Sequence, residues 1–399
     1  MKRWLFVSAL ALAGTAGAAT QAIDPAHLQL LKQIVDINTE TRNLAGLAQV
    51  RDVLVPRFES LGLKTTRHSL GNGREVLSFD TPGSTPKVLL VGHIDTVFAQ
   101  TGDFQRLSEQ GDQLVGPGVI DMKGGIVLML NVLAQLKQAG KLQHVRVVLN
   151  DDEEIGSPYS KQTLRTLAGG IPYGLVFEPG LEDGAVVRSQ SGVRWIKLTT
   201  NGKAAHAGLE PENGIDACLD LARKIAKVSQ LAQPSKGLTL NPGVIEGGSK
   251  PNVVCDRASV TFDVRFRADA DWQAVSAAIG EIGQHSDVYN PQLKQGTRTE
   301  VTQLAEMPLL PEQQTQALAA RVEAIAGAIG QPFHARSVGY GSDGNNLAET
   351  GMQLLVGVGP YGGGMHSRNE HMLVSSYQNR LTLMTQLISQ LTDTQGDKP

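Results

Sequence analysis

The sequence predicts an α/β fold: a mostly parallel sheet with helices on both faces, and a smaller α+β domain inserted into the chain. At 399 residues the chain is too long for one ordinary domain of about 150 residues. Strand-like and helical segments alternate in its first half, which is typical of a parallel sheet. The alternation changes near Arg194 and returns beyond Pro308. We therefore expect a discontinuous larger domain, 22–193 and 306–399, and an inserted domain, 194–305.

The first part of the larger domain is expected to begin with amphipathic helices and then to alternate strands with helices. Unbroken apolar runs predict buried strands, and apolar residues at helical spacing predict helices. Gly140 marks the end of one of these helices. The expected segments are the helices Pro25–Leu31, Leu44–Leu61 and Gly125–Gln138 and the strands Lys87–Val91, Val145–Leu149 and Gly174–Phe177.

The inserted domain is expected to contain an antiparallel sheet, because its strands alternate apolar and polar residues. Its expected segments are the strands Trp195–Thr199, Leu238–Ile245 and Ala258–Arg267 and the helices Gly214–Leu231 and Asp271–Gly283. The larger domain then resumes with the helix Gln313–Ile329, the strand Met352–Val358 and the closing helix Ser375–Leu391.

Residues 1–18 have the pattern of a secretory signal peptide. Lys2 and Arg3 precede an apolar run, and Ala16-Gly17-Ala18 resembles a cleavage site. The run is shorter than the roughly 20 apolar residues of a membrane-spanning helix. A buried N-terminal helix is the alternative. We expect the mature chain to be periplasmic or secreted and to have no membrane contact after the signal is removed.

Net charge and cysteine content limit the partners and the covalent links that the chain is expected to have. The net charge of −3, with both signs interspersed, gives no sign of a nucleic-acid partner. Cys218 and Cys255 could form a disulfide in an exported protein, or they could remain two buried thiols. The sequence leaves both alternatives open, although the spacing fits no zinc motif.

Acidic and histidine residues recur where strands or glycine-rich runs end, which is where open α/β sheets bind ligands. Taken singly, each segment has a plain alternative: a helix cap, a solvated acidic loop, a turn or a surface histidine pair. Four adjacent carboxylates, however, repel one another unless a cation is near. The segments are GHIDTV with His93 and Asp95, GPGVIDMKGG with Asp121, NDDEEIGS with Asp151 to Glu154, FEPG with Glu178, and MHSRNEH with His366, Glu370 and His371.

Together these segments provide nitrogen and oxygen ligands of the kind that zinc accepts. Asp95 is close enough in sequence to His93 to orient its ring. The number of carboxylates favours two metal ions that share one aspartate, an arrangement that polarises a carbonyl and activates a water molecule.

The combined motifs, with GKAAHAG, closely resemble the M20 metallopeptidases from about Pro25 to the C-terminus. Within that family the chain is most similar to the glutamate carboxypeptidase branch, which is related to succinyl-diaminopimelate desuccinylases and acetylornithine deacetylases. The resemblance implies a zinc-peptidase type of fold, in which the inserted domain acts as a lid and as a dimerisation surface.

The resemblance also implies roles for individual residues. His93, Asp121 and Glu178 would bind one zinc ion, and Asp121, Glu154 and His366 the other, with cobalt or manganese as alternative metals. Glu153 would be the general base, Asp95 would orient His93, and His206 would stabilise the oxyanion in a neighbouring subunit's active site. His371 is not the expected ligand, because the family's ligand precedes a serine.

For the substrate, the resemblance implies that Asn252 and Arg265 hold its carboxylate and that the loop Gly341-Ser342-Asp343-Gly344 lines the pocket. A surface position is the alternative for Arg265. Some glutamate carboxypeptidases have a further arginine where this chain reads VTQLAEMPLL, so a strict preference for glutamate is not expected.

The sequence thus predicts an exported, homodimeric dizinc hydrolase of amide or peptide bonds beside a free carboxylate, acting as a carboxypeptidase on small peptides or N-acyl amino acids. Two alternatives remain: an N-acyl amino acid deacylase or desuccinylase, and an inactive binding protein of the same fold. A serine hydrolase is discounted, because no G-x-S-x-G turn follows a strand.

Overall fold

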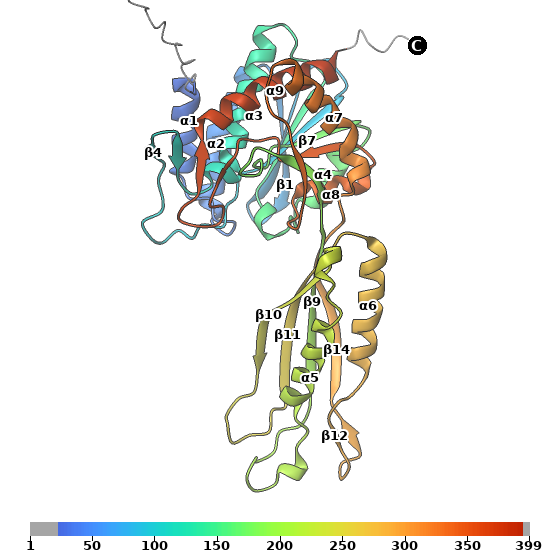
Figure 1. Cartoon of the computed structure of the whole chain (residues 1–399). Helices are drawn as coiled ribbons and strands as arrows, with labels where there is room; N and C mark the ends of the chain where they lie inside the picture. The colour runs from blue at the N-terminus through green and yellow to red at the C-terminus, as the bar shows by residue number, and fades with distance from the viewer. Residues whose placement is uncertain (1–22, 394–399) are drawn as a thin grey trace, which may run out of the picture.

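The computed structural model describes residues 23–393, so the predicted signal peptide at 1–18 lies outside the described residues. Figure 1 shows a larger domain from which a long, narrow inserted domain projects. The polypeptide crosses between the two near β9 (Gly192–Asn201) and β14 (Arg298–Met307).

The larger domain is built on an eight-stranded sheet in the order β1-β2-β6-β3-β7-β16-β8-β15. The central strands β6, β3, β7 and β16 are parallel, whereas β1, β2 and the β16–β8 pair are antiparallel. The strands span Lys64–Gly71 (β1), Arg74–Asp80 (β2), Val88–His93 (β3), Val145–Asn150 (β6), Tyr173–Val176 (β7), Val186–Gln190 (β8), Ala335–Val338 (β15) and Gln353–Val356 (β16).

Helices cover both faces of this sheet, which explains why its central strands are apolar throughout. In β3, Val88 and Leu90 pack into the core on one face, and Leu89 and Val91 into the core on the other. The first face carries α1 (Pro25–Val35), α2 (Leu44–Ser60), α3 (Gly124–Gln138), α7 (Glu312–Ala328) and α9 (Val374–Thr392), and the second carries α4 (Lys161–Ala168) and α8 (Asp343–Leu347).

The segment Val119–Gln138, which contains α3, is long and apolar enough to cross a membrane by composition. In the fold, 83% of its most apolar window is buried, which is the environment of a core helix.

A small second sheet pairs two strands from the last part of the sequence with two strands that precede α3. Its order is β17-β18-β5-β4, with β4 at Ser108–Gln110, β5 at Gln113–Val115, β17 at Gly362–Gly363 and β18 at His371–Leu373. The β18–β5 pairing places the loop that contains His366 beside the segment that leads to Asp121.

The inserted domain has an antiparallel sheet in the order β10-β11-β9-β14 with helices on one face (Figure 1). In β11 every second residue from Ala258 to Phe266 is buried, and these side chains form a core with α5 and α6. Among residues 23–393, no helix packs on the other face of this sheet. The elements are β10 (Thr239–Gly247), β11 (Arg257–Phe266), α5 (Ala217–Ser229), α6 (Asp269–Gln284) and a small hairpin of β12 (Tyr289–Asn290) and β13 (Gln295–Gly296).

The α/β fold class with an additional antiparallel module is therefore confirmed, and the expected segments correspond to observed elements with shifted ends. The helix expected at Gly214–Leu231 begins at Ala217, because the Asp216 side chain caps it by accepting a hydrogen bond from the Leu219 amide. The strands β1, β2 and β14 were not predicted; the residues of β1 and β14 are largely exposed, whereas those of β2 are mostly buried.

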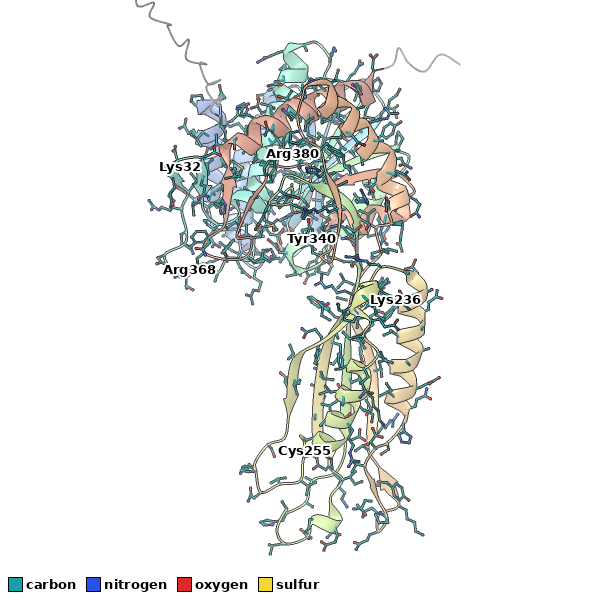
Figure 2. All side chains as sticks on the ribbon, in the orientation of Figure 1. Lys32, Lys236, Cys255, Tyr340, Arg368 and Arg380 are labelled. Carbon is teal, nitrogen blue, oxygen red and sulfur yellow. A yellow bond between two sulfur atoms is a disulfide. The ribbon has the colours of Figure 1, made fainter. Side chains whose placement is uncertain are left out.

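Cys218 and Cys255 form a disulfide with a Cα–Cα distance of 5.6 Å. It joins the first turn of α5 to the segment that enters β11, which resolves the alternatives that the sequence left open. Figure 2 shows Cys255 in the part of the inserted domain that lies away from the larger domain.

Replacing both cysteines, as Cys218→Ser with Cys255→Ser, is expected to lower the free energy of unfolding by about 2–4 kcal/mol, because the bond closes a long loop in the unfolded chain. Urea unfolding followed by circular dichroism measures it. Dithiothreitol should destabilise the wild type by a similar amount and leave the double variant unchanged; equal sensitivity of the two proteins would contradict the assignment.

Candidate active site

A cavity of about 540 Å³ lies between the two domains. The larger domain contributes acidic residues and His366 to its lining, and the inserted domain contributes Trp195, Arg265 and Leu304. Tyr340, which also lines it, is labelled in Figure 2 on the side of the larger domain that faces the inserted one.

Two glycines allow the chain to bring Asp121 into this cavity. Gly118 has a φ of 71°, and a Cβ atom there would lie 2.4 Å from Thr96. A Cβ atom on Gly125 would lie 2.2 Å from the carbonyl oxygen of Phe177, the residue before Glu178. Only glycine permits so close an approach of α3 to the end of β7, and this approach places Asp121 near Glu178.

Asp121 lies at the centre of the cluster and directs one oxygen to each of two histidines. Its Oδ1 is 3.2 Å from His93 Nε2, and its Oδ2 is 3.2 Å from His366 Nε2. Glu178 Oε1 lies 3.5 Å from His93 Nε2, and Glu154 Oε2 lies 3.3 Å from His366 Nε2. The structure thus brings together all five predicted metal ligands, as one group around each histidine with Asp121 common to both. The Glu153 carboxylate also lies within 4.8 Å of the ligand atoms of His93 and Glu178, which makes Glu153 a further candidate ligand.

Asp95 is buried behind this cluster and holds two of its parts together. His93 Nδ1 lies 3.0 Å from the Asp95 carbonyl oxygen and 3.3 Å from Oδ1 of its side chain. The same carboxylate accepts hydrogen bonds from the amides of Glu153 and Glu154 and from the Thr41 hydroxyl. It therefore fixes both the histidine ring and the turn that carries the two glutamates.

Glu370 supports Asp121 from the opposite direction. Its Oε1 accepts hydrogen bonds from the amides of Ile120 and Asp121, at 3.1 and 3.3 Å. Burial, and next the charge of Asp121, raise the pKa of Glu370 to about 8. Glu370 belongs to the MHSRNEH segment that the sequence marked as a candidate. Its role in supporting Asp121 was not predicted, because it depends on the pairing of β18 with β5, which are distant in sequence.

The carboxylates of the cluster outnumber its positively charged groups, so their negative charges are not fully compensated. Burial, and then the charge of Asp121, raise the pKa of Glu154 to about 7. Burial also raises the pKa of Glu178 to about 7, despite the nearby His93. Burial lowers the pKa of His93, but the surrounding carboxylates outweigh it and leave that pKa well above its ordinary value. The cluster therefore favours an added positive charge, whether protons or a metal ion.

The first two acids of NDDEEIGS have structural partners, which corrects the expectation that a cation must balance all four. Asp151 is buried beside Arg51, with an Nη1–Oδ2 distance of 2.6 Å, and beside Arg74 at 3.4 Å. Asp152 accepts hydrogen bonds from the amides of Tyr159 and Ser160. Only Glu153 and Glu154 face the cavity.

The donor set fits divalent metal ions. Four ligands about 2.0–2.2 Å from a tetrahedral zinc ion lie about 3.3–3.6 Å apart. The nitrogen–oxygen separations in both groups, 3.2–3.5 Å, are close to that spacing. Imidazole nitrogens and carboxylate oxygens are also the donors that zinc accepts, so both groups are candidate metal sites.

Other predicted residues lie in different places. Arg265 lines the cavity, whereas His206 and Asn252 are exposed and do not. His206 pairs with Val253, two residues from Cys255, in the part of the inserted domain that Figure 2 shows away from Tyr340. Within one chain, His206 and Asn252 therefore lie away from the cluster around Asp121. The His371 ring donates a hydrogen bond from Nδ1 to the Asn369 carbonyl oxygen, at 2.9 Å, and belongs to neither candidate ligand group.

The loop from Gly341 to Gly344 only partly lines the cavity. Gly341 does so, but Asp343 is buried and accepts hydrogen bonds from Asn150 and Ser157, at 2.7 and 2.6 Å. Thr41 was missed by the sequence analysis, since nothing in its local sequence connects it with Asp95.

Fold, cavity and donor set together are those of a metal-dependent hydrolase. A model of peptidase family M20/M25/M40 matches residues 89–390, and the chain belongs to this family. The predicted enzyme class, a hydrolase of carbon–nitrogen bonds in peptides or amides, is thereby confirmed.

Individual relatives agree with this assignment. The chain is 27% identical to carboxypeptidase G2 of Pseudomonas sp. (strain RS-16), over 92% of this chain and 89% of that protein. It is 28% identical to a putative succinyl-diaminopimelate desuccinylase of Mycobacterium tuberculosis, over 76% of this chain and 82% of that protein. A tripeptidase from Staphylococcus aureus has the same fold, with a TM-score of 0.78 at 22% identity, covering 92% of this chain and 98% of that one.

Zinc added to chelator-treated protein is expected to raise its melting temperature, because a cation relieves the repulsion among the buried carboxylates. Saturation to about 100 times the dissociation constant stabilises a protein by about 2.7 kcal/mol. Differential scanning fluorimetry measures the shift. Asp121→Asn should abolish most of it and the exposed Asp52→Asn none; an unchanged shift in Asp121→Asn would contradict the assignment.

Proposed function

We propose that this chain is an exported dizinc hydrolase that cleaves an amide or peptide bond next to a free carboxylate, acting as a carboxypeptidase on small peptides or N-acyl amino acids. The observation that carries the proposal is the division of the Asp121 carboxylate between two groups of ligands, beside Glu153. Within residues 23–393, the Glu153 side chain has no hydrogen bond or ion pair, and it faces the cavity.

His93, Glu178, Glu154 and His366, with Asp121 shared, would hold two zinc ions, which would supply polarisation of the scissile carbonyl and acidification of a bound water molecule. Cobalt and manganese accept similar donors, so availability decides the metal. Glu153 would accept a proton from the attacking water on a carboxylate oxygen. It would then donate this proton to the leaving nitrogen as the carbon–nitrogen bond breaks. Asp95 holds the backbone of Glu153 in place for this transfer.

His206 is suited to a contact with the substrate of a second subunit. Its Nδ1 accepts hydrogen bonds from the amides of Gly208 and Leu209, at 3.2 and 3.1 Å. The proton of the neutral ring is then on Nε2, where it can be donated to a developing oxyanion. The exposed Val244 and Ile245 on the edge strand β10 support a homodimer formed by the inserted domain.

Export is supported by two independent features. The N-terminal sequence has the pattern of a signal peptide, and the Cys218–Cys255 disulfide is typical of proteins in oxidising compartments. The proposed location is the periplasm or the exterior. The similarity to a putative desuccinylase supports one alternative activity, removal of an acyl group from an N-acyl amino acid. The complete donor set, together with Glu153, argues against an inactive binding protein.

Glu153→Gln is expected to keep both metal ions and to lower kcat by about 10²–10⁴-fold, because the amide cannot accept the proton. Hydrolysis of a panel of dipeptides and N-acyl amino acids, with metal counted by elemental analysis, tests this. His93→Ala should lose metal as well as activity. Wild type that binds metal but cleaves nothing in the panel would sink the proposed function.

His206→Asn is expected to be nearly inactive, yet a mixture of His206→Asn and Glu153→Gln subunits should regain part of the activity. Each mixed dimer would contain one site with a native Glu153 and a native His206 from the other subunit. Activity is assayed after the two proteins are unfolded and refolded together. If the mixture is no more active than its components, although mixed dimers form, His206 does not act across the dimer.

A further inference from the structure

Exposed hydrophobic side chains gather around the candidate active site. Ile155, Trp195, Leu304 and Met365 are 40–54% exposed, and all four line the cavity. Ile155 and Met365 come from the larger domain, and Trp195 and Leu304 from the inserted one. Large apolar groups exposed around a concave site are typical of a surface that binds an apolar ligand group. Such a group would contact both domains at once.

The contribution of the inserted domain comes from the face of its sheet that no helix covers. Trp195 on β9 is paired with Ala305 on β14, and the register shifts between Gln303 and Ala305. Leu304 is the residue within this irregularity, and irregularities of this kind redirect a side chain. Arg265 on β11 lines the cavity from the same sheet, so a carboxylate bound by Arg265 would have Trp195 and Leu304 as its apolar neighbours.

The charges on this sheet disfavour a second carboxylate. Arg265 already forms two hydrogen bonds of 2.9 Å with Asp263, and it donates a third to the Gly339 carbonyl oxygen. Glu306, two residues after Leu304, adds a carboxylate to the cavity lining; it accepts a hydrogen bond from Gln303, and Arg194 Nε lies 3.9 Å from its Oε2, so its charge is only partly compensated. The other lysine or arginine of the lining, Lys161, comes from α4 in the larger domain.

We propose, building on the function above, that the cavity selects substrates whose carboxylate-bearing residue has a bulky apolar side chain. This side chain packs against Trp195 and Leu304, while Glu306 disfavours glutamate or aspartate at the same place. The substrate class is therefore N-acyl or peptidyl derivatives of leucine-like and aromatic amino acids.

The test compares kcat/KM for N-acetyl-leucine, N-acetyl-phenylalanine, N-acetyl-glycine and N-acetyl-glutamate. A buried apolar side chain is expected to give at least about a tenfold preference over glycine, and glutamate should be poorer still. Leu304→Arg should raise the glutamate-to-leucine ratio by roughly tenfold or more, because it adds a cation for the second carboxylate. Thr302→Arg is the matched control: it adds the same charge to an exposed residue of the same strand outside the cavity lining and should leave the ratio unchanged.

The outcomes separate this inference from the proposed function. If wild type is active but prefers N-acetyl-glutamate or does not discriminate among the four, the inference is overturned and the proposed function stands. If the preference for N-acetyl-glutamate is then lost in Lys161→Met, Lys161 is the cation that binds the second carboxylate. If wild type cleaves none of the four, the proposed function fails. Calorimetric binding of N-acetyl-leucine and N-acetyl-glutamate to metal-loaded Glu153→Gln then decides the inference, which is overturned unless leucine binds more tightly.

Discussion

The burial of several carboxylates around Asp121 is the constraint on which the rest of the site depends. Removing like charges from water is unfavourable unless positive charge or hydrogen bonds compensate them. Three kinds of interaction compensate these charges. Arg51 and Arg74 neutralise Asp151, and backbone amides donate hydrogen bonds to Asp95 and Glu370. Two histidines contact Asp121. The acids nearest the cavity keep the least compensation, so the centre of the site favours a metal ion.

Much of the architecture and the five segments that carry the candidate ligands were predictable from local sequence, whereas the choice of the five residues within them rested on the family resemblance. Apolar runs predicted the parallel strands, and each ligand follows a strand or a glycine-rich run. Features that depend on distant pairing were not predictable. The exposed strand β14, the bonding of Thr41 to Asp95 and the compensation of Asp151 leave no local pattern. The resemblance implied that Asp121 is shared between a site with His93 and one with His366, and the structure adds the geometry, with one oxygen of Asp121 3.2 Å from each ring.

The inserted domain has two unlike ends. Near the larger domain, the uncovered face of its sheet contributes Trp195, Leu304 and Arg265 to the cavity. At the opposite end, the backbone around His206 is paired with the segment from Asn252 to Val254. The disulfide anchors this segment to α5. The same sheet thus separates the residues proposed to act within a subunit from those proposed to act on its neighbour.

The discontinuity of the larger domain determines when the metal site can exist. Four of the candidate ligands precede the inserted domain, and the fifth, His366, follows it near the end of the chain. A ribosome-bound chain therefore lacks His366, and with it a complete second group of candidate ligands, until the inserted domain has been synthesised. Since the sheet of β17, β18, β5 and β4 must form to position His366, both candidate groups are complete only after the two parts of the larger domain have come together.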